Sequence, residues 1–336
     1  MNNNITQQEE ERKHGDYPIA KFDLQIEDFL NQYDNINTKE NYEIVLKDFF
    51  KYLENQNEIA IFNSDNVNRL VLGYKDYLNS KILADKTINQ YLTNLNTFFK
   101  FLNFNNVKTH LKKIGHSNID KYKYITRDEL NELVKTVDIA IDEDMEFKQG
   151  YYKKHNKGTY KGNKNLIRNK AILLSLFFTG ARVTELINIK LKNIHFKDNY
   201  LILHGKGNTI YEQGFNNQVK SILKKLIAIE NITDSESYIF INQQRKQMTR
   251  ERIRQLIKEI AKDTDKRLQQ TDNEDNLTSR ATPHSFRHGL ANYLLNTKKW
   301  DINKVRNTLR HSNIAVTNNY LTTNKKELKK LQNQID

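Results

Sequence analysis

The second half of the chain holds a short segment, TGARVTEL, in which an arginine and a glutamate are spaced to act together. Gly180 is a typical helix-ending residue, so Arg182 stands at the start of the next helix. Glu185 follows three residues later, within reach of a charge-assisted hydrogen bond to the arginine. A guanidinium held in this way can present its remaining donors to an anion. Arginine at a helix start is common, so this segment alone decides nothing.

A lysine lies between two glycines further along the chain, in the segment GKG. The glycines permit a tight turn between two predicted strands, and such a turn projects Lys206 away from the sheet. A presented ammonium can donate a proton or bind an anion. The more ordinary interpretation is a solvated hairpin tip, because polar residues are usual there.

The segment HSFRH places three ionisable side chains on one predicted helix. Pro283 suits the first turn of that helix, so His284 and Arg287 share a face. His288 is four residues from His284, and this spacing also occurs in metal sites. The residue between them is not glutamate and the sequence indicates no third ligand, so we expect no metal here.

A second histidine and a tyrosine complete the set, in the segments LRHS and NNYL. His311 and Tyr320 are nine residues apart, and a single tyrosine among 17 says little by itself. The combination is more specific, because six residue types follow one another in a fixed order: Arg182, Lys206, His284, Arg287, His311 and Tyr320.

This order resembles the tyrosine recombinase (phage integrase) family, and within it the Xer type. The resemblance rests on the segments GARVTELINIK, GKGN, PHSFRHGLANYLL and RHSNIAVTNNYL. Upstream, KTINQYLTNLNTFFKFL is similar to the last helix of the family's core-binding domain. The likeness covers about residues 20–325 and implies a site-specific recombinase that cleaves and rejoins DNA.

The resemblance implies a nucleophile, Tyr320, that attacks a DNA phosphodiester and forms a 3′-phosphotyrosyl bond. Negative charge then builds on the phosphoryl oxygens, and Arg182 and Arg287 are the expected clamps because guanidinium groups match those oxygens. Glu185 would support them. No metal or other cofactor is expected, since the arginines stand where a metal would.

The remaining residues are expected to move protons or to position groups. A phenol with a pKa of about 10 needs help in losing its proton, and the resemblance assigns that help to His284. Lys206 is the expected general acid for the leaving 5′-oxygen. His311 would donate to the phosphate or position the nucleophile.

Three features depart from the family's pattern. Arg310 stands where the family often has glycine, TIYEQGF follows GKGN, and residues 142–166 replace a shorter connection. These departures fit a divergent single-enzyme Xer of the XerH-like type, acting in chromosome dimer resolution. They fit equally an integrase of a phage, plasmid or other mobile element.

The N-terminal elements predict a small helical domain. Residues 1–18 are polar and expected to be disordered. Residues 19–105 contain four amphipathic segments, typical of an all-α bundle, which the resemblance makes the core-binding DNA-binding domain. Residues 106–124 are predicted to form a basic linker.

The second domain, 125–336, is predicted to be α-rich with a small three-stranded antiparallel sheet. We expect strands at 193–197, 200–204 and 209–213, and helices at about 216–229, 249–268, 283–296, 301–309 and 313–321. Most of 148–170 is expected to be a loop. It has eight basic residues and no acid, so it is either a DNA-contacting segment, through Lys153, Lys154, Lys157, Lys161 and Lys164, or a solvated insertion.

Composition limits the class of protein. The net charge of +13 favours a polyanionic partner, and double-stranded DNA is the first candidate. With no cysteine, disulfides and thiolate metal sites are excluded. Without a secretory signal or a long apolar run, we expect a cytoplasmic protein.

The expected assembly follows from the resemblance. Family members recombine DNA as a cyclic tetramer on two duplexes, and the tail 324–336 has an apolar stripe suited to docking on a neighbour or capping its own chain. The Xer likeness adds a FtsK-like DNA translocase as a partner. Other readings are a type IB topoisomerase-like enzyme and a catalytically silent DNA-binding protein.

Overall fold

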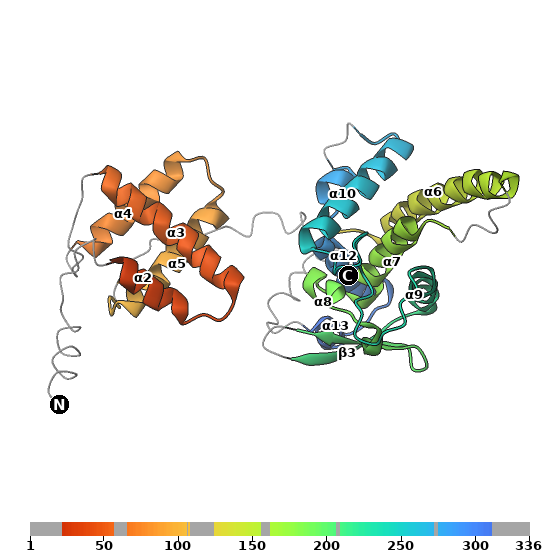
Figure 1. The fold of residues 1–336 in the computed structure, drawn as a ribbon. Coiled ribbons are helices and arrows are strands. Elements are labelled where there is room, and N and C mark those ends of the chain that lie inside the picture. Colours follow the sequence, from red (N-terminus) through yellow and green to blue (C-terminus); the bar gives the residue numbers. More distant parts are fainter. Residues whose placement is uncertain are drawn as a thin grey trace, which may run out of the picture. The chain divides into compact units, whose positions relative to one another are not determined.

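A computed structural model describes residues 22–56, 66–105, 107, 124–155, 162–205, 209–271 and 275–310. The chain divides into two compact units, residues 1–117 and 118–336. Among the described residues, helices predominate and the strands form one small antiparallel sheet (Figure 1). The predicted fold class, a mainly α chain with three antiparallel strands, is confirmed.

The first unit contains four described helices, α2 (Phe22–Asn31), α3 (Ile36–Asn55), α4 (Val67–Ser80) and α5 (Asp85–Phe101). Its core is rich in aromatic rings, and Phe29 meets Phe98 edge-on at 5.3 Å. Tyr74 is fully buried, and its hydroxyl donates to Asp48 at 2.8 Å, so its polar end is satisfied. The predicted apolar stripes therefore pack on one another as a bundle.

The second unit is built around a central helix, α7 (Lys164–Thr179), which is buried along most of its length. It packs against α6 (Arg127–Lys154), α9 (Asn217–Ile229) and α12 (Pro283–Asn292). The remaining described elements are α8 (Val183–Ile187), η3 (Leu191–Asn193), α10 (Arg250–Arg267), α11 (Leu277–Arg280), η5 (Tyr293–Thr297) and α13 (Ile302–Leu309).

The sheet lies in the second unit in the order β1, β2, β3. Its strands are β1 (Ile194–His195), β2 (Tyr200–His204) and β3 (Ile210–Gly214), and Leu203 faces Tyr211 across β2 and β3. The prediction of a first strand over 193–197 was too long. Residues Leu191–Asn193 form the turn η3 instead, and only two residues pair with β2.

The prediction that most of 148–170 is a loop was wrong for the described part of that segment. Helix α6 continues to Lys154, and α7 begins at Lys164. No proline interrupts α6, and its last buried residue is Ile141. Met145 is the last α6 side chain that packs against the core, so the sequence beyond it shows no apolar periodicity even though it remains helical.

Several predictions fall outside the described residues. These are the disorder of 1–18, nearly all of the linker 106–124, the helix at 313–321 and the tail 324–336. Among the helices that the structure describes, none combines the length and apolar character that a membrane span requires.

Candidate active site

The structure describes half of the six predicted catalytic residues: Arg182, His284 and Arg287. Lys206, His311 and Tyr320 lie outside the described residues. The chain is described up to Gly205, the first residue of the GKG segment, and again from Thr209. It is also described up to Arg310, which directly precedes His311.

Arg182 is the residue that precedes α8, and a glycine turn puts it there. Gly180 ends α7 with φ at 58°, a left-handed conformation that glycine adopts readily. A Cβ atom at Gly180 would lie 2.7 Å from Leu309 Cδ2, so the turn also has no room for a side chain. Arg182 then opens α8 with its side chain 45% exposed, accessible to a ligand from solvent.

Glu185 holds Arg182 in the way the spacing predicts. Its Oε1 lies 2.7 Å from Arg182 Nη1, and its Oε2 accepts the backbone N–H of Arg182 at 2.8 Å. The carboxylate is 2% exposed. Burial raises its pKa, but the positive charges of Arg310 and Arg182 and the backbone hydrogen bond outweigh burial, and the pKa ends below its ordinary value. Glu185 is therefore ionised and positions a half-exposed guanidinium.

Arg287 is buried beneath this turn. It is 1% exposed, and its guanidinium donates from Nη1 to the carbonyl of Gly180 and from Nη2 to the carbonyl of Leu309. These carbonyls end α7 and α13, where intrahelical partners are lacking. Arg287 thus joins the turn that presents Arg182 to the point from which the chain continues to His311.

His284 lies one turn before Arg287 on α12 and is exposed. Its ring contacts His288 at a centroid distance of 4.2 Å, nearly perpendicular. Burial lowers the pKa of His288 to about 4, with added repulsion from His284 and Arg287, so His288 is neutral near pH 7. In the described part of the chain, no group of three or more His, Asp or Glu residues is arranged to hold a metal ion.

Arg310 joins the site although the sequence analysis noted it only as a departure from glycine. It follows α13 with φ at 56°, and its side chain is 4% exposed. Its Nη2 lies 2.9 Å from Glu185 Oε2, and its Nη1 donates to Gln213 on β3. Arg182 Nη2 also approaches the Arg310 carbonyl at 3.5 Å. A basic residue at an expected glycine was the only signal in the sequence.

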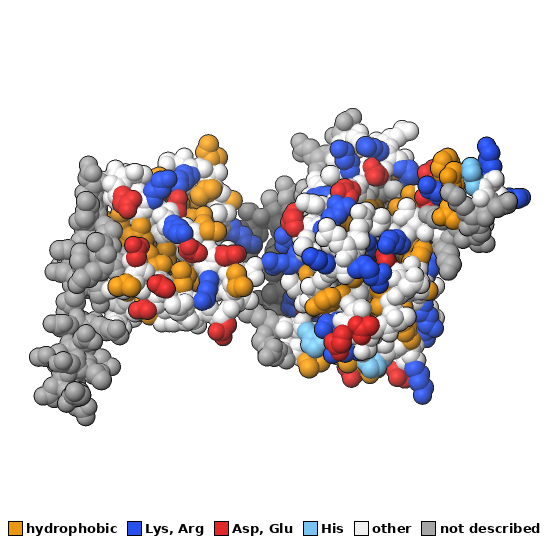
Figure 2. Space-filling view, in the orientation of Figure 1, with side chains coloured by type: hydrophobic (Ala, Val, Ile, Leu, Met, Phe, Trp, Pro, Cys, Tyr) orange, Lys and Arg blue, Asp and Glu red, His pale blue; other side chains and the backbone are white. Residues whose placement is uncertain are grey.

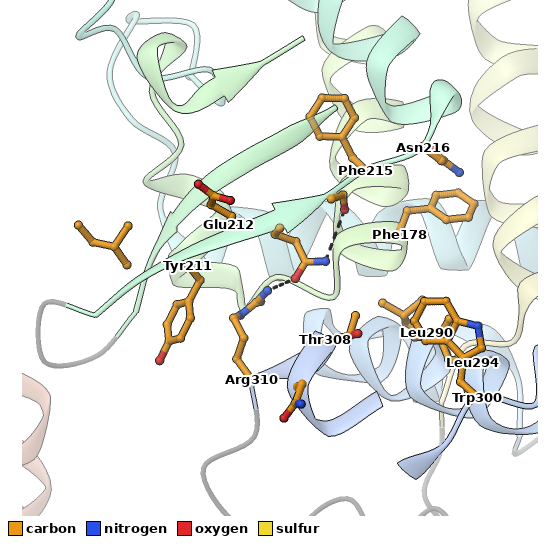
Figure 3. A pocket seen from close by; sticks show the side chains of 14 residues that line it. Phe178, Tyr211, Glu212, Phe215, Asn216, Leu290, Leu294, Trp300, Thr308 and Arg310 are labelled. Carbon is orange, nitrogen blue, oxygen red and sulfur yellow. Dashed lines mark hydrogen bonds between the residues drawn. The ribbon is translucent and has the colours of Figure 1, made fainter. Parts of the chain in front are cut away.

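A cavity of about 800 Å³ lies beside this cluster (Figure 3). Arg310 reaches across one part of it from the end of α13 towards β3, and Phe215, Leu294 and Trp300 line the rest. The cluster of Arg182, Glu185 and Arg310 therefore meets the cavity at Arg310.

The lysines predicted to contact DNA differ in their surroundings. Lys153 and Lys154 stand in the last turn of α6, and Figure 2 shows basic and hydrophobic side chains around that end of the helix. Lys164 Nζ instead lies 3.4 Å from Glu230, whose carboxylate is buried. Lys157 and Lys161 lie outside the described residues.

Comparison with known proteins adds a family match over much of the chain. Residues 123–327 match the Phage integrase family. The tyrosine recombinase XerC of Leptospira interrogans (strain Fiocruz L1-130) is 28% identical over 299 residues, which cover 88% of this chain and 86% of that protein. The tyrosine recombinase XerD of Oceanobacillus iheyensis is 23% identical, over 87% of this chain and 90% of that protein.

Solved structures share the fold at low sequence identity. The XerH site-specific recombinase bound to palindromic difH substrate has a TM-score of 0.63 at 16% identity, covering 89% of this chain and 80% of that one. The Tn1549 transposon integrase in complex with transposon right end DNA also has a TM-score of 0.63, at 17% identity, covering 92% and 98%.

Proposed function

This chain belongs to the phage integrase family, and from that premise we propose that it resolves chromosome dimers as a site-specific recombinase of the Xer type. Membership makes it a tyrosine recombinase, an enzyme that cleaves and rejoins DNA. The Xer assignment is supported by the XerC and XerD relatives, which align over at least 86% of their own lengths and thus along both units.

The site's chemistry begins with the phosphate clamp. Arg182 is half-exposed and held by an ionised Glu185, so its remaining donors can receive the non-bridging oxygens of a scissile phosphate. This arrangement is the observation that carries the mechanism. Arg287 is the second clamp in the proposal. Because Arg287 is 1% exposed, DNA binding must displace the residues that cover its guanidinium before the guanidinium can contact the phosphate.

We assign the nucleophile and the proton transfers as the resemblance to the family implies. The Tyr320 hydroxyl attacks phosphorus and passes its proton to His284 while the bond from phosphorus to the 5′-oxygen breaks. Lys206 donates a proton to that oxygen, and His311 donates to the phosphate. The products are a 3′-phosphotyrosyl bond and a free 5′-hydroxyl. A 5′-hydroxyl from another strand reverses the steps, so rejoining needs no external energy source.

Recombination of two duplexes requires four strand cleavages, so four protomers provide four active sites. The helical unit 19–105 binds DNA, and the tail 324–336 links neighbouring protomers. A FtsK-like translocase activates the complex, and the protein works in the cytoplasm on a specific duplex site.

A second candidate function is integration of a phage, plasmid or other mobile element. The extension of α6 to Lys154 favours it, because the corresponding connection is expected to be shorter in the common paired Xer enzymes.

A plasmid recombination assay separates the two functions. Plasmids carry either two direct copies of a palindrome-like site from the host's replication terminus or a mobile-element end paired with its target. Excision between the two identical terminus sites, stimulated by the host's FtsK-like translocase, is expected. If recombination occurred only between the two unlike sites, integration and not dimer resolution would be the function of this protein.

A further inference from the structure

Arg310 occupies a backbone conformation that costs an arginine free energy. Its φ of 56° is left-handed, and for a residue with a side chain this costs about 1 kcal/mol relative to glycine. Such a conformation persists when surrounding contacts over-determine it. The side chain, 4% exposed, supplies those contacts.

The contacts of Arg310 connect two elements that are distant in sequence. On one side its guanidinium pairs with Glu185 of α8 at 2.9 Å, and Glu185 in turn holds Arg182. On the other side it donates to Gln213 of β3, and it lies over the Tyr211 ring at 5.7 Å (Figure 3). A planar group with several fixed donors suits such a bridge better than a single ammonium.

Strand β3 transmits this anchoring to the turn that carries Lys206. The backbone N–H of Gly205 donates to the Thr209 carbonyl at 2.8 Å and closes the hairpin. A Cβ atom on Gly205 would lie 2.7 Å from Tyr211 Cε2, so the ring is packed directly against the residue before Lys206. Tyr211 is therefore in contact with Gly205 and also faces Arg310.

We propose that Arg310 is a positioning residue, which anchors β3 to the Arg182–Glu185 pair and thereby fixes Gly205 and Thr209, the described ends of the β2–β3 hairpin on either side of Lys206. The inference rests on the proposed function, in which Lys206 is the general acid. It predicts a larger defect in leaving-group protonation than in the rest of the reaction. Arg310 also helps to keep Glu185 ionised, so its loss slows both kinds of substrate, but only a substrate with an ordinary leaving oxygen needs the acid.

The test compares Arg310→Gly with wild type on two nicked DNA substrates, one with an ordinary 5′-oxygen at the scissile phosphate and one with sulfur there. Sulfur leaves without protonation, so its cleavage does not need the acid. Glycine removes the side chain and suits the backbone conformation. The ratio of the sulfur rate to the oxygen rate is expected to rise about tenfold, since misplaced groups commonly cost that much or more.

Two further variants make the result interpretable. Lys299→Gly likewise replaces a cation at positive φ, 53°, with glycine, but Lys299 is exposed, so its ratio should equal that of wild type. Gln213→Leu removes the acceptor on β3 and leaves Arg310 in place, so its ratio should also rise. If Arg310→Gly does not fold, Gln213→Leu by itself tests the positioning role.

The outcomes separate the positioning role from the enzyme's function. If Arg310→Gly and Gln213→Leu slow both substrates equally, the positioning role is overturned while the recombinase stands. If wild type forms no Tyr320-dependent adduct on either substrate, the proposed function is wrong, and the positioning role of Arg310, which rests on it, is wrong as well.

Discussion

The buried guanidinium of Arg287 donates a hydrogen bond to the carbonyl oxygen of Gly180. This bond runs from α12 to the turn that presents Arg182. Through its other nitrogen, Arg287 also binds the carbonyl of Leu309, where the chain leaves α13 towards His311. Arg287 is therefore hydrogen-bonded to the turn that presents Arg182, the other predicted clamp.

Replacing Arg287 by alanine should destabilise the second unit. Two carbonyls lose their charged donor inside the protein, which costs about 3 kcal/mol in the free energy of unfolding. Urea unfolding followed by circular dichroism measures the change. Arg254→Ala is the matched control, because Arg254 is exposed and its pair with Glu251 spans 3.5 Å, so its cost should stay below about 0.5 kcal/mol. Equal midpoints for the two variants would contradict the linking role of Arg287.

The turn at Gly180 should not tolerate a side chain. Gly180→Ala forces a positive φ on alanine and brings its Cβ 2.7 Å from Leu309 Cδ2, so we expect a loss of about 2 kcal/mol in unfolding free energy and slower DNA cleavage. Gly150→Ala is the contrasting variant. It lies within α6 with nothing within 4 Å of a new Cβ, and should gain about 0.5 kcal/mol. A Gly180→Ala protein as stable as wild type would show that this turn does not need glycine.

The sequence predicted the parts of this site that depend on neighbouring residues. Glu185 is one helical turn from Arg182, so their pairing follows from spacing alone, and it is observed. The contacts of Arg310 join residues 310, 185 and 213, and no local pattern encodes such a contact. The burial of Arg287 likewise depends on α7 and α13 meeting over α12.

In the fold, too, the sequence predicts the elements whose pattern is local and misses those whose pattern is not. Amphipathic segments that pack on a core, such as α9 and α10, were predicted to within a residue or two. The part of α6 after Met145 packs on no core, so it has no apolar periodicity and the sequence predicts a loop there.

His288 should make the second unit less stable in mild acid. Its pKa of about 4 lies below the ordinary value of 6.5, so the unfolded chain binds the proton first as pH falls. Stability that is present at pH 7 is therefore lost on acidification, by about 2 kcal/mol between pH 7 and pH 5. Urea unfolding at both pH values measures it, with His288→Leu as the comparison. If the variant keeps the full pH dependence, another group is responsible.

The basic end of α6 should contribute to DNA affinity without sequence preference. The double variant Lys153→Ala, Lys154→Ala is expected to weaken binding and to reduce the slope of log affinity against log salt by about 2, as two phosphate contacts are lost. Fluorescence anisotropy across a salt series measures the slope. Lys164→Ala is the internal control, because Lys164 is paired with the buried Glu230, and its slope should match wild type. If only Lys164→Ala changed the slope, the DNA contact would lie on α7 and not at the end of α6.

Tyr320 is the proposed nucleophile, and a nicked suicide substrate reveals whether it forms the covalent bond to DNA. Candidate sites from the host genome are incubated with wild type and with Tyr320→Phe, and a denaturing gel separates protein–DNA adducts. We expect a shifted band for wild type at a palindrome-like site and none for Tyr320→Phe, which should still bind that DNA. A band of equal strength with Tyr320→Phe would contradict it.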